Sequence, residues 1–236
     1  MRRALRASWQ GNRIFLAKVA FFAYICTQIV TESSMRLKPP KFIRWLMPDL
    51  IWEMEDKSAV YLTFDDGPTP GITEWILSTL DKYDAKATFF VLGKNVEMYP
   101  DLYRRIVEAG HRIGNHTYSH QKGWGMSLER YIEDVDFAND LLHTELFRPP
   151  YARITPAQTR ALSKRYKLVM WDVLSRDYNR ALSPRTCLRN VTRYLEGGSI
   201  VVFHDSEKSF RNMSYALPRT LEAVRAMGLR CKAIDL

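Results

Sequence analysis

Short apolar runs alternate with longer amphipathic stretches from residue 59 onward, and no other feature constrains the fold as strongly. The runs at 59–64, 87–92 and 199–203 have the length and the residue types of buried strands. The stretches at 72–83 and 217–227 have helical periodicity, and a short last strand is expected at 231–234. Strands that alternate with helices predict an α/β fold with a parallel sheet and helical crossovers. About seven strands in one chain favour a (β/α) barrel, complete or incomplete, over two domains.

Composition limits the classes of function. The 236 residues are 46% hydrophobic and 26% charged, which fits one globular domain. The net charge of +9 is uneven, because residues 1–44 hold nine Lys or Arg and one acid, which leaves 26 basic and 25 acidic residues for 45–236. The folded part is almost neutral, so we expect no nucleic-acid partner. Cys26, Cys187 and Cys231 contain no CxxC pair and are interpreted as free thiols.

The N-terminal segment 1–34 has two open interpretations. Four arginines precede an apolar run at 19–30, a pattern typical of a signal anchor that would associate with a membrane and place the protein at the cell envelope. The run is short for a membrane span. The alternative is that translation begins at Met35 and that the protein is cytoplasmic. We predict that residues 35–58 form a strap packed on the domain and that 59–236 form the catalytic domain.

Adjacent carboxylates, Asp65 and Asp66, follow the first predicted strand. Mutual repulsion makes a purely structural role costly, although an acidic turn is the ordinary alternative. His116 and His120 follow a later strand and are four residues apart, so one helical turn would place both imidazoles on one face. Two histidines and one carboxylate are a common ligand set that leaves positions open for water and substrate. We therefore predict a metal site made of Asp66, His116 and His120.

Further candidate groups lie at other predicted strand ends, which is where barrel enzymes carry their reactive residues. His204 follows the buried run at 199–203 and could exchange a proton near neutral pH, although a structural histidine is the alternative. Arg148 lies in a rigid Arg-Pro-Pro-Tyr segment and could clamp a carboxylate, with a structural loop as the alternative. Asp177 is a second candidate carboxylate and is preferred over Asp172.

Four motifs, taken together and in this order, resemble the polysaccharide deacetylase family, also called the NodB-homology domain or carbohydrate esterase family 4. They are Asp-Asp-Gly-Pro at 65–68, His-Thr-Tyr-Ser-His at 116–120, Arg-Pro-Pro-Tyr at 148–151 and His-Asp at 204–205. The resemblance runs from about residue 59 to the C-terminus. It implies a deformed (β/α) barrel of the NodB type.

The resemblance also implies a role for each candidate residue. The metal ligands would be Asp66, His116 and His120. Asp65 would be the general base, and Arg148 would orient it. The backbone N–H of Tyr151 would hold the oxyanion. His204 would be the general acid, and Asp177 would be the carboxylate that tunes it. The cofactor would be one divalent ion, with zinc favoured over cobalt, nickel or manganese. The substrate would be an acetylated polysaccharide or oligosaccharide, such as peptidoglycan or a chitin-type polymer.

Departures from the family pattern are mild. Tyr178 replaces a Trp, Ala152 replaces a Gly and Val202 replaces a Leu, which could alter the acyl pocket or the substrate groove. A sugar deformylase and an acetyl-xylan esterase are alternative activities. A non-haem iron oxygenase uses the same ligand set, but such sites usually lie on a β-sandwich. A catalytically dead carbohydrate-binding module is the alternative that is not an enzyme.

Overall fold

The computed structural model describes residues 37–40, 44–45 and 47–236 of the chain. Residues 37–236 form a unit of their own. The two interpretations of 1–34 fall on residues outside the described part and stay predictions. Within the described part, no helix combines the length and apolar character that crossing a membrane requires.

One parallel sheet organises this unit. Its strands follow the order β1-β6-β5-β4-β3-β2-β8-β7, and β9 pairs with β2 outside this path. Among the described residues no ladder joins β1 to β7, so the barrel is left open. The strands are β1 Leu50–Ile51, β2 Ala59–Asp65, β3 Thr88–Val91, β4 Arg112–Asn115, β5 Leu146–Phe147, β6 Lys167–Val169, β7 Val173–Leu174, β8 Ile200–His204 and β9 Arg230–Cys231.

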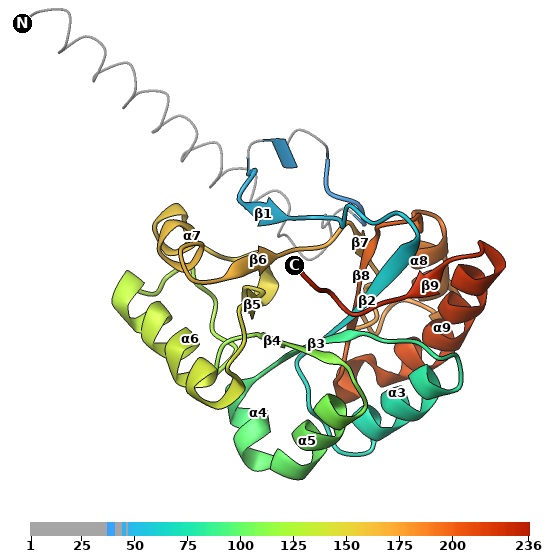
Figure 1. The fold of residues 1–236 in the computed structure, drawn as a ribbon, viewed down its shortest axis with the longest axis horizontal. Coiled ribbons are helices and arrows are strands. Elements are labelled where there is room, and N and C mark those ends of the chain that lie inside the picture. The colour runs from blue at the N-terminus through green and yellow to red at the C-terminus, as the bar shows by residue number, and fades with distance from the viewer. Residues whose placement is uncertain (1–36, 41–43, 46) are drawn as a thin grey trace, which may run out of the picture. The chain divides into compact units, whose positions relative to one another are not determined.

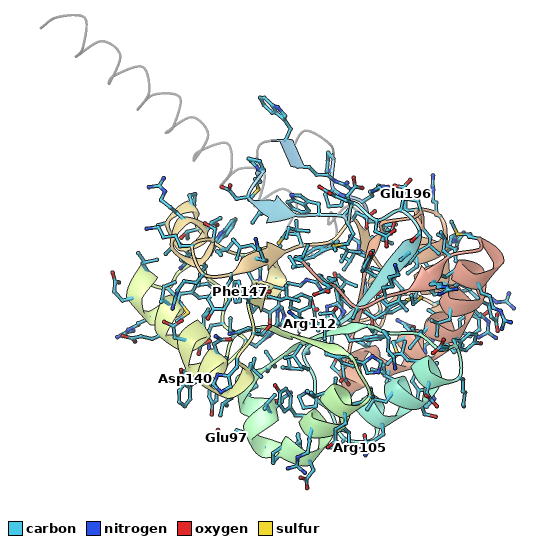
Figure 2. The ribbon with its side chains drawn as sticks, viewed as in Figure 1. Glu97, Arg105, Arg112, Asp140, Phe147 and Glu196 are labelled. Atoms are coloured by element: carbon cyan, nitrogen blue, oxygen red, sulfur yellow. The ribbon has the colours of Figure 1, made fainter. Side chains whose placement is uncertain are left out.

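Helices connect most of the successive strands and lie around the outside of the sheet (Figure 1). They are α3 Ile72–Asp81, α4 Gly93–Met98, α5 Pro100–Glu108, α6 Leu128–Leu142, the 3₁₀ turn η1 Pro150–Ala152, α7 Pro156–Leu162, α8 Pro184–Thr192 and α9 Glu207–Ala226. Exposed charged residues such as Glu97, Arg105 and Asp140 lie on these outer helices, whereas the fully buried Phe147 lies in the interior (Figure 2). This distribution follows from the amphipathic periodicity of the helices.

β2 lies between β3 and β8 in the sheet, and all seven of its residues are buried. A parallel strand that is covered on both faces needs such a continuous apolar run. Phe64 of β2 stacks on Phe89 of β3 and on Phe203 of β8, with ring centroids 5.0 and 6.2 Å apart. These contacts tie the three central strands together. The register between β2 and β8 then pairs Asp65 with His204 at the carboxyl ends of both strands.

The predicted alternation and the deformed (β/α) barrel are confirmed, with three differences in detail. β1 was not predicted, because a two-residue strand leaves no periodic signal, and β9 overlaps the predicted last strand at 231–234 only at Cys231. β1 lies within the predicted strap 35–58, so part of that segment is an edge strand of the sheet. The last helix begins at Glu207, ten residues before the predicted start at 217. Met213 and Ala216 lie before Pro218 and continue the buried face of the helix toward its N-terminus.

Candidate active site

Titratable side chains gather where β2, β4 and β8 end. Asp65 and His204 are the last residues of β2 and β8 and lie side by side in the register. His116 comes directly after Asn115, the last residue of β4. The carboxyl ends of parallel strands meet at one edge of a barrel, so residues far apart in the sequence share one site.

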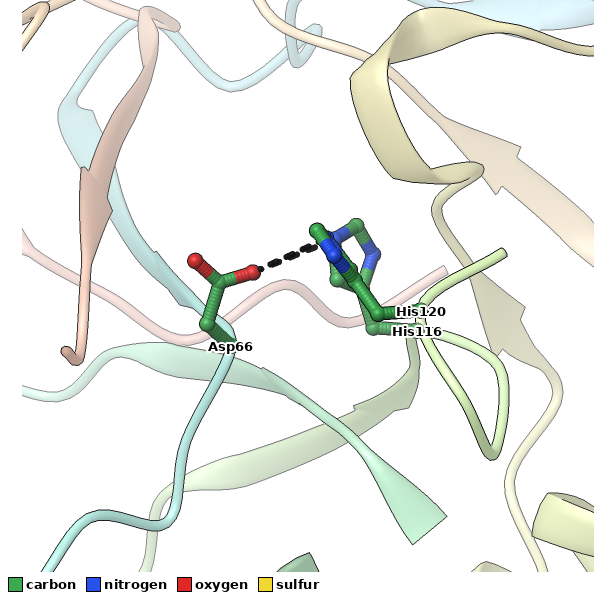
Figure 3. Close-up of side chains that lie close together, drawn as sticks. All are labelled: Asp66, His116 and His120. Atoms are coloured by element: carbon green, nitrogen blue, oxygen red, sulfur yellow. Dashed lines mark ion pairs between the residues drawn. The ribbon is translucent and has the colours of Figure 1, made fainter. Parts of the chain in front are cut away.

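Asp66, His116 and His120 converge on one point (Figure 3). Nε2 of His120 lies 3.2 Å from Oδ1 of Asp66, and Nε2 of His116 lies 3.7 Å from the same oxygen. One ligand atom from each residue lies within 4.8 Å of the others. Two ligands at about 2.1 Å from a tetrahedral ion stand about 3.4 Å apart, so these separations suit three ligands on one ion.

The chemistry of these side chains fits a bound cation. Oδ1 of Asp66 is buried and has no hydrogen-bond partner among the described residues, which is costly for a carboxylate unless a cation neutralises it. Nδ1 of His116 lies 2.7 Å from the backbone oxygen of Arg148. That contact places the proton on Nδ1 and leaves the Nε2 lone pair for a metal. Burial lowers the pKa of His116 to about 4, so the ring is neutral, as a ligand must be.

The segment that carries both histidines is a loop, not the helical turn that their spacing predicted. Thr117 and His120 have φ angles of 70° and 62°, which an α-helix excludes. Side chains replace the helical hydrogen bonds: Asp134 of α6 accepts from the N–H groups of Tyr118 and Ser119, and Thr117 accepts from the N–H of His120. The two imidazoles still come together, with ring centroids 5.2 Å apart. The prediction that the two imidazoles lie close together is correct, but the helical turn from which it was argued is not present.

Arg148 lies inside the barrel with no exposed surface. Its Nη1 donates to Oδ1 of Asp65 and to Oγ1 of Thr63, both at 2.7 Å. Nε and Nη2 donate to the backbone oxygens of Val169 and Met170 at 3.1 and 2.8 Å. Burial lowers the pKa of Arg148, and the charge of Asp65 offsets part of this effect. The guanidinium therefore holds the Asp65 carboxylate in one orientation, next to the three candidate ligands.

His204 is oriented by Asp177. Oδ1 of Asp177 lies 2.7 Å from Nδ1 of His204, and Oδ2 accepts the backbone N–H of His204 at 2.7 Å. Burial alone lowers the pKa of His204, but Asp177, Asp66 and Asp65 outweigh it and raise the pKa to about 9. Asp172 does not reach this site, because it accepts from the N–H of Ile200 at the other end of β8. Of the two rival carboxylates, only Asp177 contacts His204.

A sequence model of the polysaccharide deacetylase family matches residues 53–171, just over half of the 236 residues. The chain belongs to the polysaccharide deacetylase family. The match includes the motifs that carry the three candidate ligands, Asp65 and Arg148. His204 and Asp177 lie beyond it and join the site through the fold.

Relatives of the chain have named activities. A peptidoglycan-N-acetylglucosamine deacetylase of Bacillus cereus is 34% identical over 183 residues, which cover 74% of this chain and 66% of the relative. Chitin deacetylase 1 of Saccharomyces cerevisiae is 39% identical over 124 residues, or 49% of this chain and 40% of the relative. The crystal structure of the Bc1960 peptidoglycan N-acetylglucosamine deacetylase matches with a TM-score of 0.76 and 29% identity, covering 83% of this chain and 95% of that one. The chain thus spans about two thirds of the first relative and less than half of the second.

Two of the three departures from the polysaccharide deacetylase pattern lie at the site. Ala152 has a φ angle of 55°, a left-handed conformation that glycine adopts more easily. The Tyr178 ring lies edge-on to His204, with centroids 5.0 Å apart, so it shapes the surroundings of that imidazole. Val202 is almost fully buried in β8 and pairs with Thr63, away from the ligands. None of these positions removes a predicted reacting group.

Sequence reasoning missed several residues of the polysaccharide deacetylase site. The hydroxyl of Tyr151 lies 3.2 Å from Nδ1 of His120, so this side chain reaches a candidate ligand, whereas the sequence suggested only its backbone. Asp134 organises the histidine loop from α6. The side-chain amide of Asn95 donates to the backbone oxygen of Asp66 at 2.8 Å. Asp134 and Asn95 lie on helices with ordinary amphipathic patterns, and the sequence held no signal that would single them out.

Proposed function

We propose that the chain is a metal-dependent hydrolase that removes N-acetyl groups from a polymer containing N-acetylglucosamine, with peptidoglycan as the first candidate. The observation that carries this proposal is the position of Asp65. Its carboxylate is fixed by the buried Arg148 beside the ligand set of Asp66, His116 and His120. A second carboxylate that is oriented but is not a ligand suits a general base next to a metal.

The metal would be held by Asp66, His116 and His120, and zinc suits a site of two nitrogens and one oxygen. When bound, a divalent ion there would polarise an acyl carbonyl and lower the pKa of a coordinated water. Asp65 would accept the proton from the attacking water. Arg148 keeps the Asp65 carboxylate in place during that transfer through the 2.7 Å contact of its Nη1.

The leaving group would be protonated from the other side. Asp177 raises the pKa of His204 above its ordinary value, which favours a protonated ring that would donate its proton from Nε2 to the departing amine. The Nδ1 contact with Asp177 fixes the ring orientation that this requires. The backbone N–H of Tyr151 is proposed as an oxyanion donor. Acetate and a free amino sugar would be the products.

Acetate release tests the proposal. Purified protein is treated with chelator, reloaded with zinc, cobalt, nickel or manganese, and incubated with peptidoglycan, chitin oligomers and acetyl-xylan. We expect metal-dependent acetate release, highest on an N-acetylglucosamine polymer. Release from acetyl-xylan alone would favour the esterase alternative, and release of formate from an N-formyl sugar would favour the deformylase. A chain that binds no divalent metal, or releases nothing from any of these substrates, would contradict the proposal.

Asp65→Asn separates the base from the metal site. The variant should lose on the order of 10²–10⁴ in rate, the usual contribution of acid–base catalysis, while metal affinity stays near that of the wild type. His116→Ala is the matched variant, and it should lose the metal itself. Equal metal loss in both variants would show that Asp65 is a ligand rather than a base.

A further inference from the structure

The loop that joins β2 to α3 carries Asp66 in a strained conformation. Asp66 has a φ angle of 81°, which disfavours a residue with a side chain by about 1–2 kcal/mol, so surrounding contacts must hold it. On one side, the N–H of Asp66 donates to Phe90, its carbonyl accepts from Asn95, and Gly67 accepts from Leu92. These contacts tie the loop to β3 and α4 only.

Asp205 holds the loop from the other side. It comes directly after His204 at the end of β8 and is fully buried. Its backbone N–H donates to the carbonyl of Asp65 at 2.7 Å, and its carbonyl accepts from Oγ1 of Thr69 at 2.7 Å. Asp205 therefore contacts the residues that flank the Asp66-Gly67-Pro68 turn at both ends.

The carboxyl group of Asp205 adds a third attachment. Its Oδ2 accepts from Oγ1 of Thr73 at 2.5 Å, and that hydroxyl also accepts from the N–H of Thr69 at 2.7 Å. A methyl group on Gly67 would lie 2.2 Å from Oδ2 of Asp205, which is far inside contact distance. The Gly67 α-carbon thus packs directly on the carboxyl group. The loop has no room to move toward β8 while Asp205 is in place.

Stability alone does not explain an aspartate here. Oδ1 of Asp205 is buried without a hydrogen-bond partner among the described residues, and such a group costs about 1–3 kcal/mol. The proposed reaction makes no use of this carboxyl group. Instead, the carboxyl group packs against Gly67 in the turn that carries Asp66, and it accepts a hydrogen bond from Thr73.

We infer that Asp205 is a positioning residue for the metal site, which acts by clamping the Asp66-Gly67 turn and so fixing the Asp66 carboxylate for the ion. The inference depends on the proposed metal-dependent function. Groups that orient metal ligands typically contribute 10–100-fold to metal affinity. Without the carboxyl group the turn can relax into the vacated space, and a metal ligand must be held within about 0.5 Å to be effective.

Zinc affinity tests the clamp without reference to activity. The full chain, stripped of metal, is titrated with zinc against a chromogenic chelator, and its cobalt complex is examined by visible absorption, which reports coordination geometry. Asp205→Ala should bind zinc at least tenfold more weakly and show an altered cobalt spectrum. Thr73→Val, which removes only the hydroxyl on Oδ2, should act in the same direction. Asp205→Asn keeps the shape and the acceptor and should bind zinc within about threefold of the wild type.

Asp172 supplies a matched control. It is as fully buried as Asp205 and accepts a serine hydroxyl, from Ser199, and a backbone N–H, from Ile200. Ile200 and His204 are the two ends of β8, so Asp172 lies about 13 Å from the site at about 3.3 Å per residue. Asp172→Ala should lower the melting temperature but leave the zinc affinity of the site made of Asp66, His116 and His120, and its cobalt spectrum, unchanged.

Gly67→Ala adds a test of the direct contact. The methyl group should weaken zinc binding strongly in the wild type, because it collides with Oδ2 of Asp205. In the Asp205→Ala background the same change should have a smaller effect, because the obstacle is gone. Equal effects in both backgrounds would show that the two residues do not act through each other.

The outcomes separate the two proposals. A folded Asp205→Ala chain with wild-type zinc affinity and cobalt spectrum overturns the clamp and leaves the metal-dependent hydrolase intact. A wild-type chain that takes up neither zinc nor cobalt overturns both. Should Asp205→Ala fail to fold, Thr73→Val decides the question, because equal zinc affinity in Thr73→Val and the wild type would refute the clamp.

Discussion

Replacing Arg148 by Met tests how much the buried ion pair with Asp65 contributes to the free energy of unfolding. Arg148 has no exposed surface and Asp65 is 4% exposed, so neither charge can turn to water when its partner is lost. The unbranched methionine fills much of the same volume but removes the charge and all the donors. The Asp65 carboxylate is then left buried and unpaired.

The magnitude follows from this burial. Removing one partner of a buried ion pair costs about 3–5 kcal/mol, and the lost bonds to Val169 and Met170 place this variant at the upper end. In a domain of this size each kcal/mol lowers the melting temperature by about 2–4 °C, so we expect a fall of roughly 10–20 °C. Arg165→Met is the matched control, because the Arg165–Asp136 pair at 2.9 Å is exposed and such pairs contribute about 0–1 kcal/mol.

Urea and thermal unfolding of chelator-treated protein at neutral pH measure these effects. Adding Asp65→Asn to Arg148→Met removes the unpaired charge, and we expect the double variant to regain about 1–3 kcal/mol over Arg148→Met alone. The reasoning is refuted if Arg148→Met unfolds within 1 kcal/mol of Arg165→Met, roughly the contribution of an exposed pair. It is also refuted if Asp65→Asn gives no recovery in the Arg148→Met background.

Three further predictions follow from individual contacts. Burial lowers the pKa of His111 to about 4, and its Nδ1 accepts the N–H of Ala87. The neutral ring therefore contributes stability that is complete above about pH 6.5 and is lost as the pH falls toward 4, so His111→Asn, which keeps an acceptor, should flatten urea-measured stability across that window. Asp177→Asn removes a charge that raises the pKa of His204, so an NMR titration of the metal-free chain should find that pKa well below 9, and an unchanged value would contradict this. Ala152→Gly should raise the free energy of unfolding by about 0.5–1 kcal/mol, because glycine relieves the left-handed conformation at φ 55°.

The local sequence was sufficient to predict a strand where burial on both faces requires apolar residues. β2 is covered on both faces and so needs a continuous apolar run, which the segment 59–64 supplies. β1 escaped prediction because two residues carry no pattern and form a strand only through their neighbours. The histidine loop shows the limit of spacing arguments, because Asp134 replaces the hydrogen bonds of the expected helical turn from a distant helix.

The sequence by itself determined the α/β class, the strand ends that carry reactive groups, and the family, because each depends on the order and type of residues along the chain. Only the tertiary structure decided which of those groups meet. The register of β2 against β8 places Asp65 beside His204, and the path of the chain after β5 turns Arg148 inward to Asp65. It also selected Asp177 over Asp172 and brought Asp205 against Gly67. These are contacts between distant segments, and they depend on strand order, register and burial, which no local pattern encodes.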